Sequence, residues 1–419
     1  MPILIILTFL LAPAYAIRFK LGPVPTDILM MWVFLVWVIF VWQLTAKKQL
    51  HDFLKFKKTL NSKLLIFIGL FFVAGLTSLF VKGFDIKKLG QFLVLFLQPI
   101  SIFLITDFTI KNNPKLKSHL FLITYFLLAL AGLYAIFQYF TLLGLPQAYW
   151  GNAVEPKRAL SFFMHPNFYA LWSAPLLALL IPDLMIRVRN WKLPGRLSLG
   201  VVGEIGNWKF IIAWLLGAIG LLLSFSRAGW LGLAIAMLVY LIVAADKKIR
   251  KLALYALIVI FIVIVSIPNL RWRFVLPFYR EKSTVSRLSL WETGWKGIKE
   301  APITGLGLTG FSKNWTRLNT DPNLEAHNFP HNIFLDFWVE MGILGLISFV
   351  GITALLTYHG LSSVVSPFMG LNKTADKSAS YKLAVSLFLI CLLTQGLIDN
   401  PYFKNDLAMV FWLILSLAI

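Results

Sequence analysis

The sequence predicts an all-α polytopic membrane protein, and two observations carry this prediction. Hydrophobic residues make up 59% of the 419 residues, more than a soluble fold can bury, because a soluble chain must still cover its surface with polar groups. The apolar residues form repeated long runs without the alternation of barrel strands. Since a membrane helix needs about 20 apolar residues, we expect one integral membrane domain over residues 1–419 with about twelve transmembrane helices.

The individual spans follow from the apolar runs and the residues that break them. The first run ends in Ala14-Tyr15-Ala16, a pattern that signal peptidases cut, but no Lys or Arg precedes it, so we interpret it as a helix. We interpret Ser226-Arg227 as a tight turn between two helices, with one broken apolar region as the alternative. The expected spans lie near 3–17, 27–46, 63–81, 88–107, 118–144, 166–186, 209–225, 228–245, 252–268, 333–359, 381–398 and 406–419.

Basic residues in short loops predict the orientation, because such loops are retained on the cytoplasmic side. Alternate short loops beginning at Lys47 hold twenty-one Lys or Arg, whereas the opposite short loops hold nine. Both termini are therefore expected in the cytoplasm, and the large loop 269–332 is expected to face outward. This arrangement accounts for the net charge of +21, so we expect no nucleic-acid partner.

The sequence offers no cofactor site. The glycine-rich run from Gly305 to Gly310 departs from the dinucleotide spacing and lacks a Walker lysine, and we interpret it as a tight turn. The single cysteine, Cys391, lies in an apolar run, and no two histidines have metal-ligand spacing on one helix face. We therefore predict neither a metal nor another cofactor, so a reaction must be driven by an activated substrate or a gradient.

Polar residues gather in four clusters on the outward side of the predicted topology, and arginines outnumber carboxylates there. Arginine pairs bidentately with phosphate oxygens, and fixed cations can stabilise a diphosphate leaving group without a metal. The clusters are Lys157-Arg158 with His165-Pro166-Asn167; Ser226-Arg227; Arg271, Arg273, Arg280, Lys282, Arg287, His327 and His331; and Asp399, Asn400 and Lys404.

Arg227 and His331 are the strongest single candidates. Arg227 lies between two apolar runs, where placing a charge in the membrane costs free energy, so a functional role is the default interpretation. The alternative is an interfacial arginine whose guanidinium reaches water. His331 follows Pro330 and precedes a long predicted helix, where the positive end of the helix dipole favours a neutral imidazole and anionic ligands. Such an imidazole can accept a proton from a hydroxyl. A local packing or capping role is the alternative.

The remaining polar residues have weaker functional signals. Arg287 opens an amphipathic segment with Trp291, Trp295, Ile298 and Lys299, which predicts a helix lying on the membrane. We interpret Asp336 and Glu340 as structural partners of basic residues. His165 could be a ligand or a device that starts a helix, and Asn167 has the pattern of an N-cap.

These motifs resemble the O-antigen ligase and polymerase superfamily of membrane glycosyltransferases. His331-Asn332, nine residues, Gly342, two residues and Gly345 resemble the ligase motif His-Asn-x9-Gly-x-x-Gly. Ser226-Arg227 with Leu231, Arg287 ahead of Leu290-Trp291, and Arg158 with His165-Pro166-Asn167 are similar to the arginine motifs of the family. The resemblance covers residues 150–419, and His327, a second His-Asn, departs from the family pattern.

The resemblance implies a GT-C-like, metal-independent glycosyltransferase in the bacterial cytoplasmic membrane. Its donor would be a glycan on undecaprenyl diphosphate, and its acceptor a hydroxyl of lipid A-core or a similar lipid or protein. Arg158, Arg227 and Arg287 would hold the diphosphate, and His331 would act as the general base or orient the donor. Asn167, His327 and Asn332 are further candidates for substrate contacts.

Two other functions stay open at this point. A polysaccharide polymerase of the same superfamily would join lipid-linked repeats, and the compact chain with one large loop favours the ligase over it. An anion or solute transporter would place charged residues at the midplane of its spans. The charges of this sequence instead cluster at the outward interface.

Overall fold

The computed structural model describes most of the chain, and it divides into two compact units. Unit 1 comprises Met1–Ile123, Arg287–His359 and Gln395–Ile419, and unit 2 comprises Thr124–Ser286 and Gly360–Thr394. The described residues are 1–13, 17–21, 24–56, 61–152, 156–189, 207–266, 268, 282–319, 321, 324–368 and 377–419.

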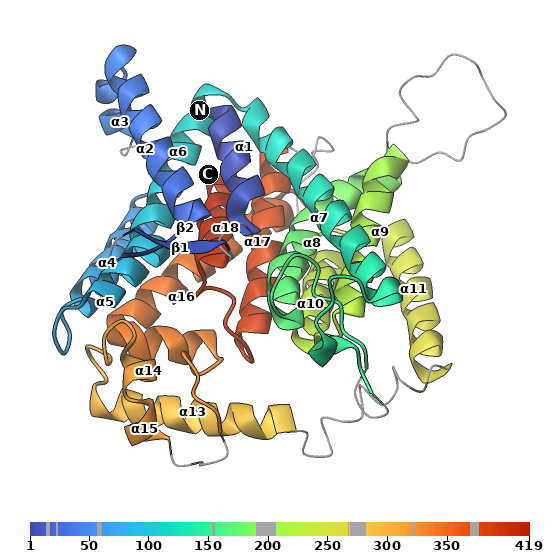
Figure 1. The fold of residues 1–419 in the computed structure, drawn as a ribbon. Coiled ribbons are helices and arrows are strands. Elements are labelled where there is room, and N and C mark those ends of the chain that lie inside the picture. Colours follow the sequence, from blue (N-terminus) through green and yellow to red (C-terminus); the bar gives the residue numbers. More distant parts are fainter. Residues whose placement is uncertain are drawn as a thin grey trace. The chain divides into compact units, whose positions relative to one another are not determined.

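Helices dominate both units (Figure 1). Unit 1 contains α1 (Pro2–Leu11), α2 (Ile28–Ala46), α3 (Leu50–Phe56), α4 (Ser62–Ser78), α5 (Ile86–Phe92), the π-helical turn η3 (Leu93–Leu97), α6 (Gln98–Asn112), α14 (Gly310–Lys313), α15 (Trp315–Leu318), α18 (Asn405–Leu415) and η6 (Ser416–Ala418). Unit 2 contains η4 (Gln147–Tyr149), α8 (Pro166–Arg189), α9 (Asn207–Leu223), α10 (Arg227–Val243) and α11 (Lys247–Ser266). Four further helices have residues in both units, namely α7 (Lys115–Thr141), α13 (Lys282–Glu300), α16 (Ile333–Phe368) and α17 (Lys377–Gly396).

The prediction of an all-α membrane protein is confirmed at the level of helices. Each predicted span coincides with a helix, and six helices among the described residues are long and apolar enough to cross a membrane. Five shorter apolar helices, α1, α4, α9, α10 and the one beginning at Asn405, lie at other predicted spans. The predicted break at Ser226-Arg227 is also confirmed, because α9 ends at Leu223 and Phe225 takes φ +50 before α10 begins.

A short antiparallel hairpin between α1 and α2 was not predicted. Strand β1 (Arg18–Leu21) pairs with β2 (Val24–Asp27), with Arg18 opposite Asp27. Asp27 then caps α2 through a 2.8 Å hydrogen bond from the Met30 N–H, and its other oxygen accepts from the Asn405 side chain at 2.6 Å. Strand β1 alternates polar and apolar residues over four positions, the shortest run that indicates a strand, whereas β2 contains Pro25 and does not alternate.

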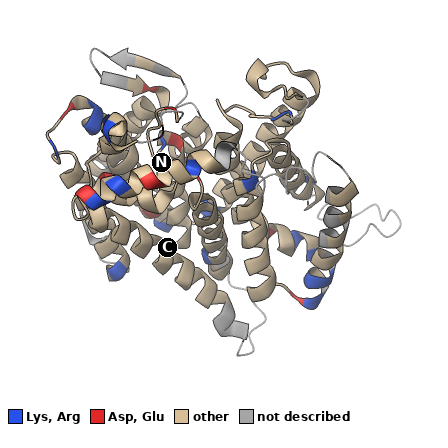
Figure 2. Cartoon of the chain, turned by 90° about the horizontal axis from the view of Figure 1, so that it is seen from below, with Lys and Arg blue, Asp and Glu red and all other residues tan. Residues whose placement is uncertain are grey.

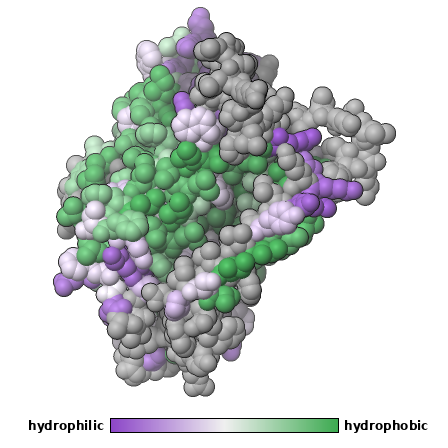
Figure 3. Space-filling view, turned by 90° about the vertical axis from the view of Figure 1, so that its right-hand side faces the viewer, coloured by the Kyte–Doolittle hydropathy of each residue, from purple (hydrophilic) through white to green (hydrophobic). Residues whose placement is uncertain are grey.

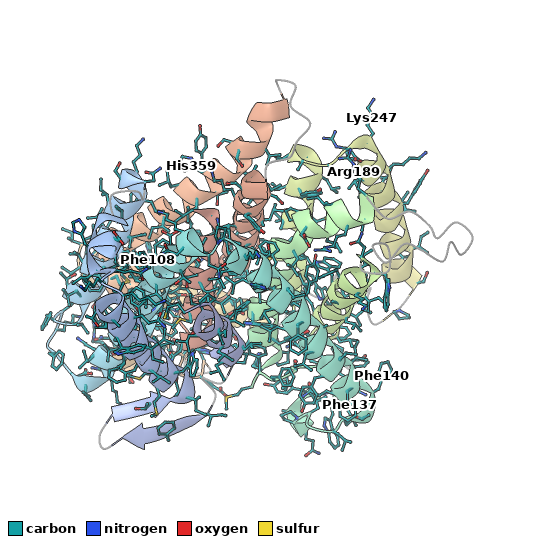
Figure 4. The ribbon with its side chains drawn as sticks, turned by 90° about the horizontal axis from the view of Figure 1, so that it is seen from above. Phe108, Phe137, Phe140, Arg189, Lys247 and His359 are labelled. Carbon is teal, nitrogen blue, oxygen red and sulfur yellow. The ribbon has the colours of Figure 1, made fainter. Side chains whose placement is uncertain are left out.

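The exposed faces of the unit 2 helices are apolar, as expected of helices that face lipid. Phe137 and Phe140 of α7, labelled in Figure 4, are 45% and 76% exposed. Figure 3 shows a largely hydrophobic face in the space-filling view. Where α8 ends and α11 begins, Arg189 lies 3.6 Å from Asp246, next to Lys247 (Figure 4). These residues lie in two loops that the sequence assigns to the cytoplasm.

An aromatic cluster forms the centre of unit 1 and fixes the segment between α17 and α18. The ring centroid of Phe337 in α16 lies 4.2 Å from the ring centroid of Phe349 and 5.1 Å from that of Tyr402. The Tyr402 hydroxyl donates to the Leu95 carbonyl at 2.6 Å and accepts from the Trp412 indole at 2.9 Å. Because Tyr402 is fully buried, these contacts hold the segment that carries Asp399.

The second half of the large predicted loop folds as helices with a core of their own. Buried residues of α13, α14, α15 and α16, and of the connection between α13 and α14, form this core: Leu290, Ile298, Leu306, Phe311, Trp315, Leu318 and Val339. Ile298, expected on the membrane face of α13, therefore packs inward, while Trp295 stays 44% exposed. Both signs of charge are visible along α13 in Figure 2.

Glycines let this loop approach α16 closely. Gly342 breaks the helix with φ 68 and ψ −171, and a Cβ there would lie 1.9 Å from the Ile303 carbonyl oxygen. Gly305, also at φ +68, lies against the same turn of α16, where the Leu306 N–H donates to the Val339 carbonyl at 2.7 Å. The run from Gly305 to Gly310 thus forms turns, as the sequence predicted.

Candidate functional site

His331 stands at the start of α16 in an uncommon backbone conformation. Its φ is 57°, in the left-handed region that residues other than glycine seldom adopt. Asn332 follows and caps the helix, because its side-chain oxygen accepts from the Phe334 and Leu335 N–H groups at 3.1 and 3.2 Å. The amide nitrogen of Asn332 donates to the Leu397 carbonyl at 3.0 Å. A substrate contact of Asn332 stays a prediction, since the helix cap uses its oxygen.

The imidazole of His331 lies between two side chains. Its Nδ1 is 3.0 Å from Oδ1 of Asp399, and its Nε2 is 3.3 Å from Nδ1 of His327. The side chain of His331 is 29% exposed, whereas that of Asp399 is 4% exposed. The histidine is therefore accessible while its carboxylate partner is buried, which suits a base oriented by a second group.

Asp399 stays charged despite its burial. Burial raises the pKa of this carboxyl, but the hydrogen bond from His331 and the charges of His331 and Arg287 outweigh it, so the pKa lies below its ordinary value. Oδ1 also accepts from the Asn400 N–H at 2.9 Å. A buried carboxylate in this position can stabilise a positive charge on His331.

His327 completes the histidine pair. Its ring lies 5.2 Å from the His331 ring, centroid to centroid, and 6.2 Å from the Trp315 ring. Burial and the neighbouring His331 lower the pKa of His327, and Glu325 opposes them. His327 is thus disposed to be neutral at neutral pH.

Arg287 lies on α13, and its side chain is partly buried. Its charge contributes to the low pKa of Asp399, which places the guanidinium within electrostatic reach of the histidine pair. The structure therefore brings together four residues, His331, His327, Asp399 and Arg287, in unit 1. The sequence-predicted residues Arg271, Arg273 and Arg280 lie outside the described residues, as does the side chain of Lys282.

Arg158 and Arg227 are associated with one turn of unit 2. The Arg158 Nε donates to the Ser224 carbonyl at 3.0 Å, and its NH2 donates to Oδ1 of Asn167 at 2.6 Å. Ser224 lies in the turn that leads into Arg227, the first residue of α10. The Ala159 N–H donates to the Leu223 carbonyl at 2.8 Å. Two guanidiniums are therefore presented by segments that are tied together.

The prediction that Asn167 is an N-cap is wrong. Helix α8 begins at Pro166, so Asn167 lies inside its first turn. His165 takes the capping role instead, because its Nδ1 accepts from the Asn167 N–H at 3.0 Å. Proline suits the first helical position, where its missing N–H costs nothing. The side chain of Asn167 is thereby left to bind Arg158.

The prediction that Asp336 and Glu340 pair with basic residues holds in part, because the charge of Lys88 acts on Glu340, whereas no salt bridge to either carboxylate occurs among the described residues. Oε1 of Glu340 accepts from the Phe311 N–H at 2.9 Å and so holds the start of α14. Asp336 is fully buried, and neither of its oxygens has a hydrogen-bond partner within the described part of the chain. Glu340 is thus structural, while the surroundings of Asp336 give it no assigned partner.

Sequence reasoning named Asp399 in an outward polar cluster but did not connect it with His331. The two residues lie 68 positions apart, so no local spacing reveals the pair. The one available signal was topological, because both residues immediately flank predicted spans on the same side of the membrane.

The helices and their apolar faces define a multi-pass α-helical membrane protein with polar side chains grouped at helix ends. Residues 212–350 match the protein-family model described as O-antigen ligase. This match supports the resemblance to the O-antigen ligase superfamily that the motifs indicated. It includes Arg227, Arg287 and His331, whereas Arg158 and Asn167 precede it. No curated protein matches the chain.

Proposed function

We propose that the protein transfers a glycan from an undecaprenyl-diphosphate carrier to an acceptor hydroxyl on the outer face of the bacterial cytoplasmic membrane. The observation that carries this proposal is the placement of His331 between Asp399 and His327, with Arg287 in reach of the same carboxylate. The O-antigen ligase family match supports a membrane glycosyltransferase in general terms.

The proposed reaction is a displacement at the anomeric carbon of the donor sugar. The acceptor oxygen forms the new glycosidic bond as the bond to the diphosphate oxygen breaks and that oxygen takes the electron pair. The histidine group of unit 1 removes the acceptor proton. The guanidiniums proposed to neutralise the leaving diphosphate are those that the family resemblance assigns to it, namely Arg158, Arg227 and Arg287.

The proposed location follows from the distribution of basic residues. About twelve spans with both termini in the cytoplasm place the loop 269–332 on the outer side. The lipid-linked donor and a lipid or protein acceptor are the expected partners, beside membrane lipids. The oligomeric state is left open.

The test is transfer in proteoliposomes that contain the full-length protein and a lipid-linked glycan. We expect His331→Ala and Arg227→Ala each to reduce the transfer rate by at least about 100-fold, since a base and a charge stabiliser of the transition state are lost. Arg317→Ala and Arg250→Ala are matched controls and should transfer normally. Arg317 pairs with Glu300 on the surface, and Arg250 donates to the Leu241 carbonyl.

The products separate the alternatives. A conjugate of glycan and lipid A-core identifies a ligase, whereas longer lipid-linked chains formed without another acceptor identify a polymerase. Movement of the intact donor or of an anion across the membrane, without a new glycosidic bond, would identify a transporter. Full activity of both arginine and histidine variants would contradict the mechanism, and loss of activity with EDTA, restored by a divalent ion, would contradict its metal independence.

A further inference from the structure

The hydrogen bonds of His331 determine which nitrogen of the pair can meet a substrate. A carboxylate can only accept, so the contact with Asp399 requires the proton of His331 on Nδ1. A neutral imidazole carries one N–H, which makes Nε2 of His331 an acceptor. The 3.3 Å contact is then donated by Nδ1–H of His327. Nε2 of His327 is left with a lone pair, and no hydrogen bond to it occurs among the described residues.

From this geometry we infer that His327, and not His331, contacts the acceptor hydroxyl, and that the two histidines pass the proton on as a relay ending beside Asp399. The inference rests on the proposed function and assigns its base. His327 begins a second His-Asn in the sequence, four residues before His331.

Each proton in the relay is accounted for. The acceptor O–H bond breaks, and Nε2 of His327 takes that proton. Nδ1 of His327 releases its own proton to Nε2 of His331, whose ring becomes an imidazolium. The electron pair of the broken sugar–oxygen bond leaves with the diphosphate, and the oxygen of the acceptor forms the new glycosidic bond. After the diphosphate departs, His331 returns the proton on its Nε2 to Nδ1 of His327, and Nε2 of His327 releases the acceptor proton to water, which restores both starting tautomers.

The charges around the pair favour this direction of transfer. Asp399 is buried and ionised, so positive charge is better stabilised on His331 than on His327. The lowered pKa of His327 keeps its Nε2 available at neutral pH. Among the described residues, the charge of Glu325 acts on His327, and that of Arg287 acts on Asp399.

The ring of His331 is fixed from several sides, as a relay requires. The backbone carbonyl of His331 accepts a hydrogen bond from the Trp291 indole at 3.4 Å. The side chain of the following Asn332 is bound to the start of α16 and to the Leu397 carbonyl. The left-handed backbone at His331 directs the chain from Pro330 into α16. Neither histidine ring needs to move for the proton to pass.

A double-mutant cycle tests the relay in the same proteoliposomes. We expect His327→Ala and His331→Ala each to reduce the rate by at least about 100-fold, and the double variant to be no slower than the slower single variant, because residues that act as a unit are not additive. Added imidazole should restore part of the rate to His327→Ala, which a packing defect would not allow. His359→Ala is the matched control, since His359 lies on α16 near Asn61 (Figure 4).

The outcomes distinguish this inference from the proposed function. A fully active His327→Ala protein beside an inactive His331→Ala protein would overturn the relay and leave the proposed function intact, and so would multiplying effects in the double variant. If the wild-type protein transfers no glycan, the proposed function fails. The pair is then tested alone by ¹⁵N NMR of labelled histidine, in which coupling across the hydrogen bond between His331 and His327 is expected and its absence would refute the pair.

Discussion

Asp399 shows how one buried residue determines the chemistry of its neighbour. As a carboxylate it fixes the tautomer of His331 and offers a negative charge to the imidazolium. Asparagine has nearly the same shape but no charge. The substitution Asp399→Asn therefore separates the electrostatic role of Asp399 in the proposed mechanism from its role in packing.

We predict that Asp399→Asn reduces the transfer rate by at least about 100-fold while the protein still folds. The stability difference between the wild-type protein and the variant should also depend on pH. Because the pKa of Asp399 is lowered in the folded protein, its stabilising contribution is present above the unfolded value of about 3.9 and is lost as the pH falls through the folded value.

The measurement is the thermal unfolding of both proteins in detergent, at neutral pH and in acid. The variant should unfold at a lower temperature at neutral pH, and the gap should narrow in acid. A difference in unfolding temperature between the two proteins that is the same at neutral pH and in acid would contradict the role of the charge.

At the scale of single residues, the sequence indicated candidate site residues but not their contacts. His331, Arg227 and Arg158 could be chosen because charge and imidazole are rare at the ends of apolar helices. Their partners could not be chosen, because Asn167 and Asp399 reach them through folding and not through spacing. The cap at α8 was wrongly assigned for a similar reason, since a histidine ring took the place of the asparagine.

At the scale of elements, the Gly342 kink explains a glycine in the ligase-like motif. If the residue at this position had a side chain, its Cβ would overlap the Ile303 carbonyl oxygen that lies against the surface of the helix. The kink therefore seats the loop of Gly305 and Leu306 on α16, ten residues beyond the helix cap that follows His331.

We predict that Gly342→Ala destabilises the protein by more than about 1 kcal/mol, because alanine does not tolerate positive φ and its Cβ would overlap the Ile303 oxygen. Thermal unfolding in detergent measures the effect. Gly69→Ala in α4 is the control, since nothing lies within 4 Å of its added Cβ. Equal unfolding temperatures for the two variants would refute the packing argument.

The elements themselves could largely be predicted from the sequence. Every apolar run of sufficient length became a helix, because lipid requires each backbone group to be satisfied within its own segment. The hairpin of β1 and β2 was missed because β1 alternates over only four positions and β2 does not alternate, and the core of α13 to α15 was missed because it is assembled with Val339 of α16.

At the scale of the whole molecule, the number and direction of the crossings stay predictions. We expect a membrane-impermeant maleimide applied to intact cells to label Glu325→Cys but not Lys47→Cys, because only the first lies in the predicted outer loop. Both positions are exposed, and the native Cys391 is buried. Labelling of Lys47→Cys alone would reverse the orientation.

The segment from α13 to α14 makes contacts with α16 that also restrict how the protein can move. Backbone hydrogen bonds join Leu306 to Val339 and Leu308 to Ser78, Glu340 holds the start of α14, and the Trp291 indole binds the carbonyl of His331. These contacts connect the part of α13 that carries Arg287 to the turn that carries His331, so the two segments should move together. Any movement of this segment away from α16 would break these hydrogen bonds, so we expect the two to keep their relative position while substrate enters and product leaves.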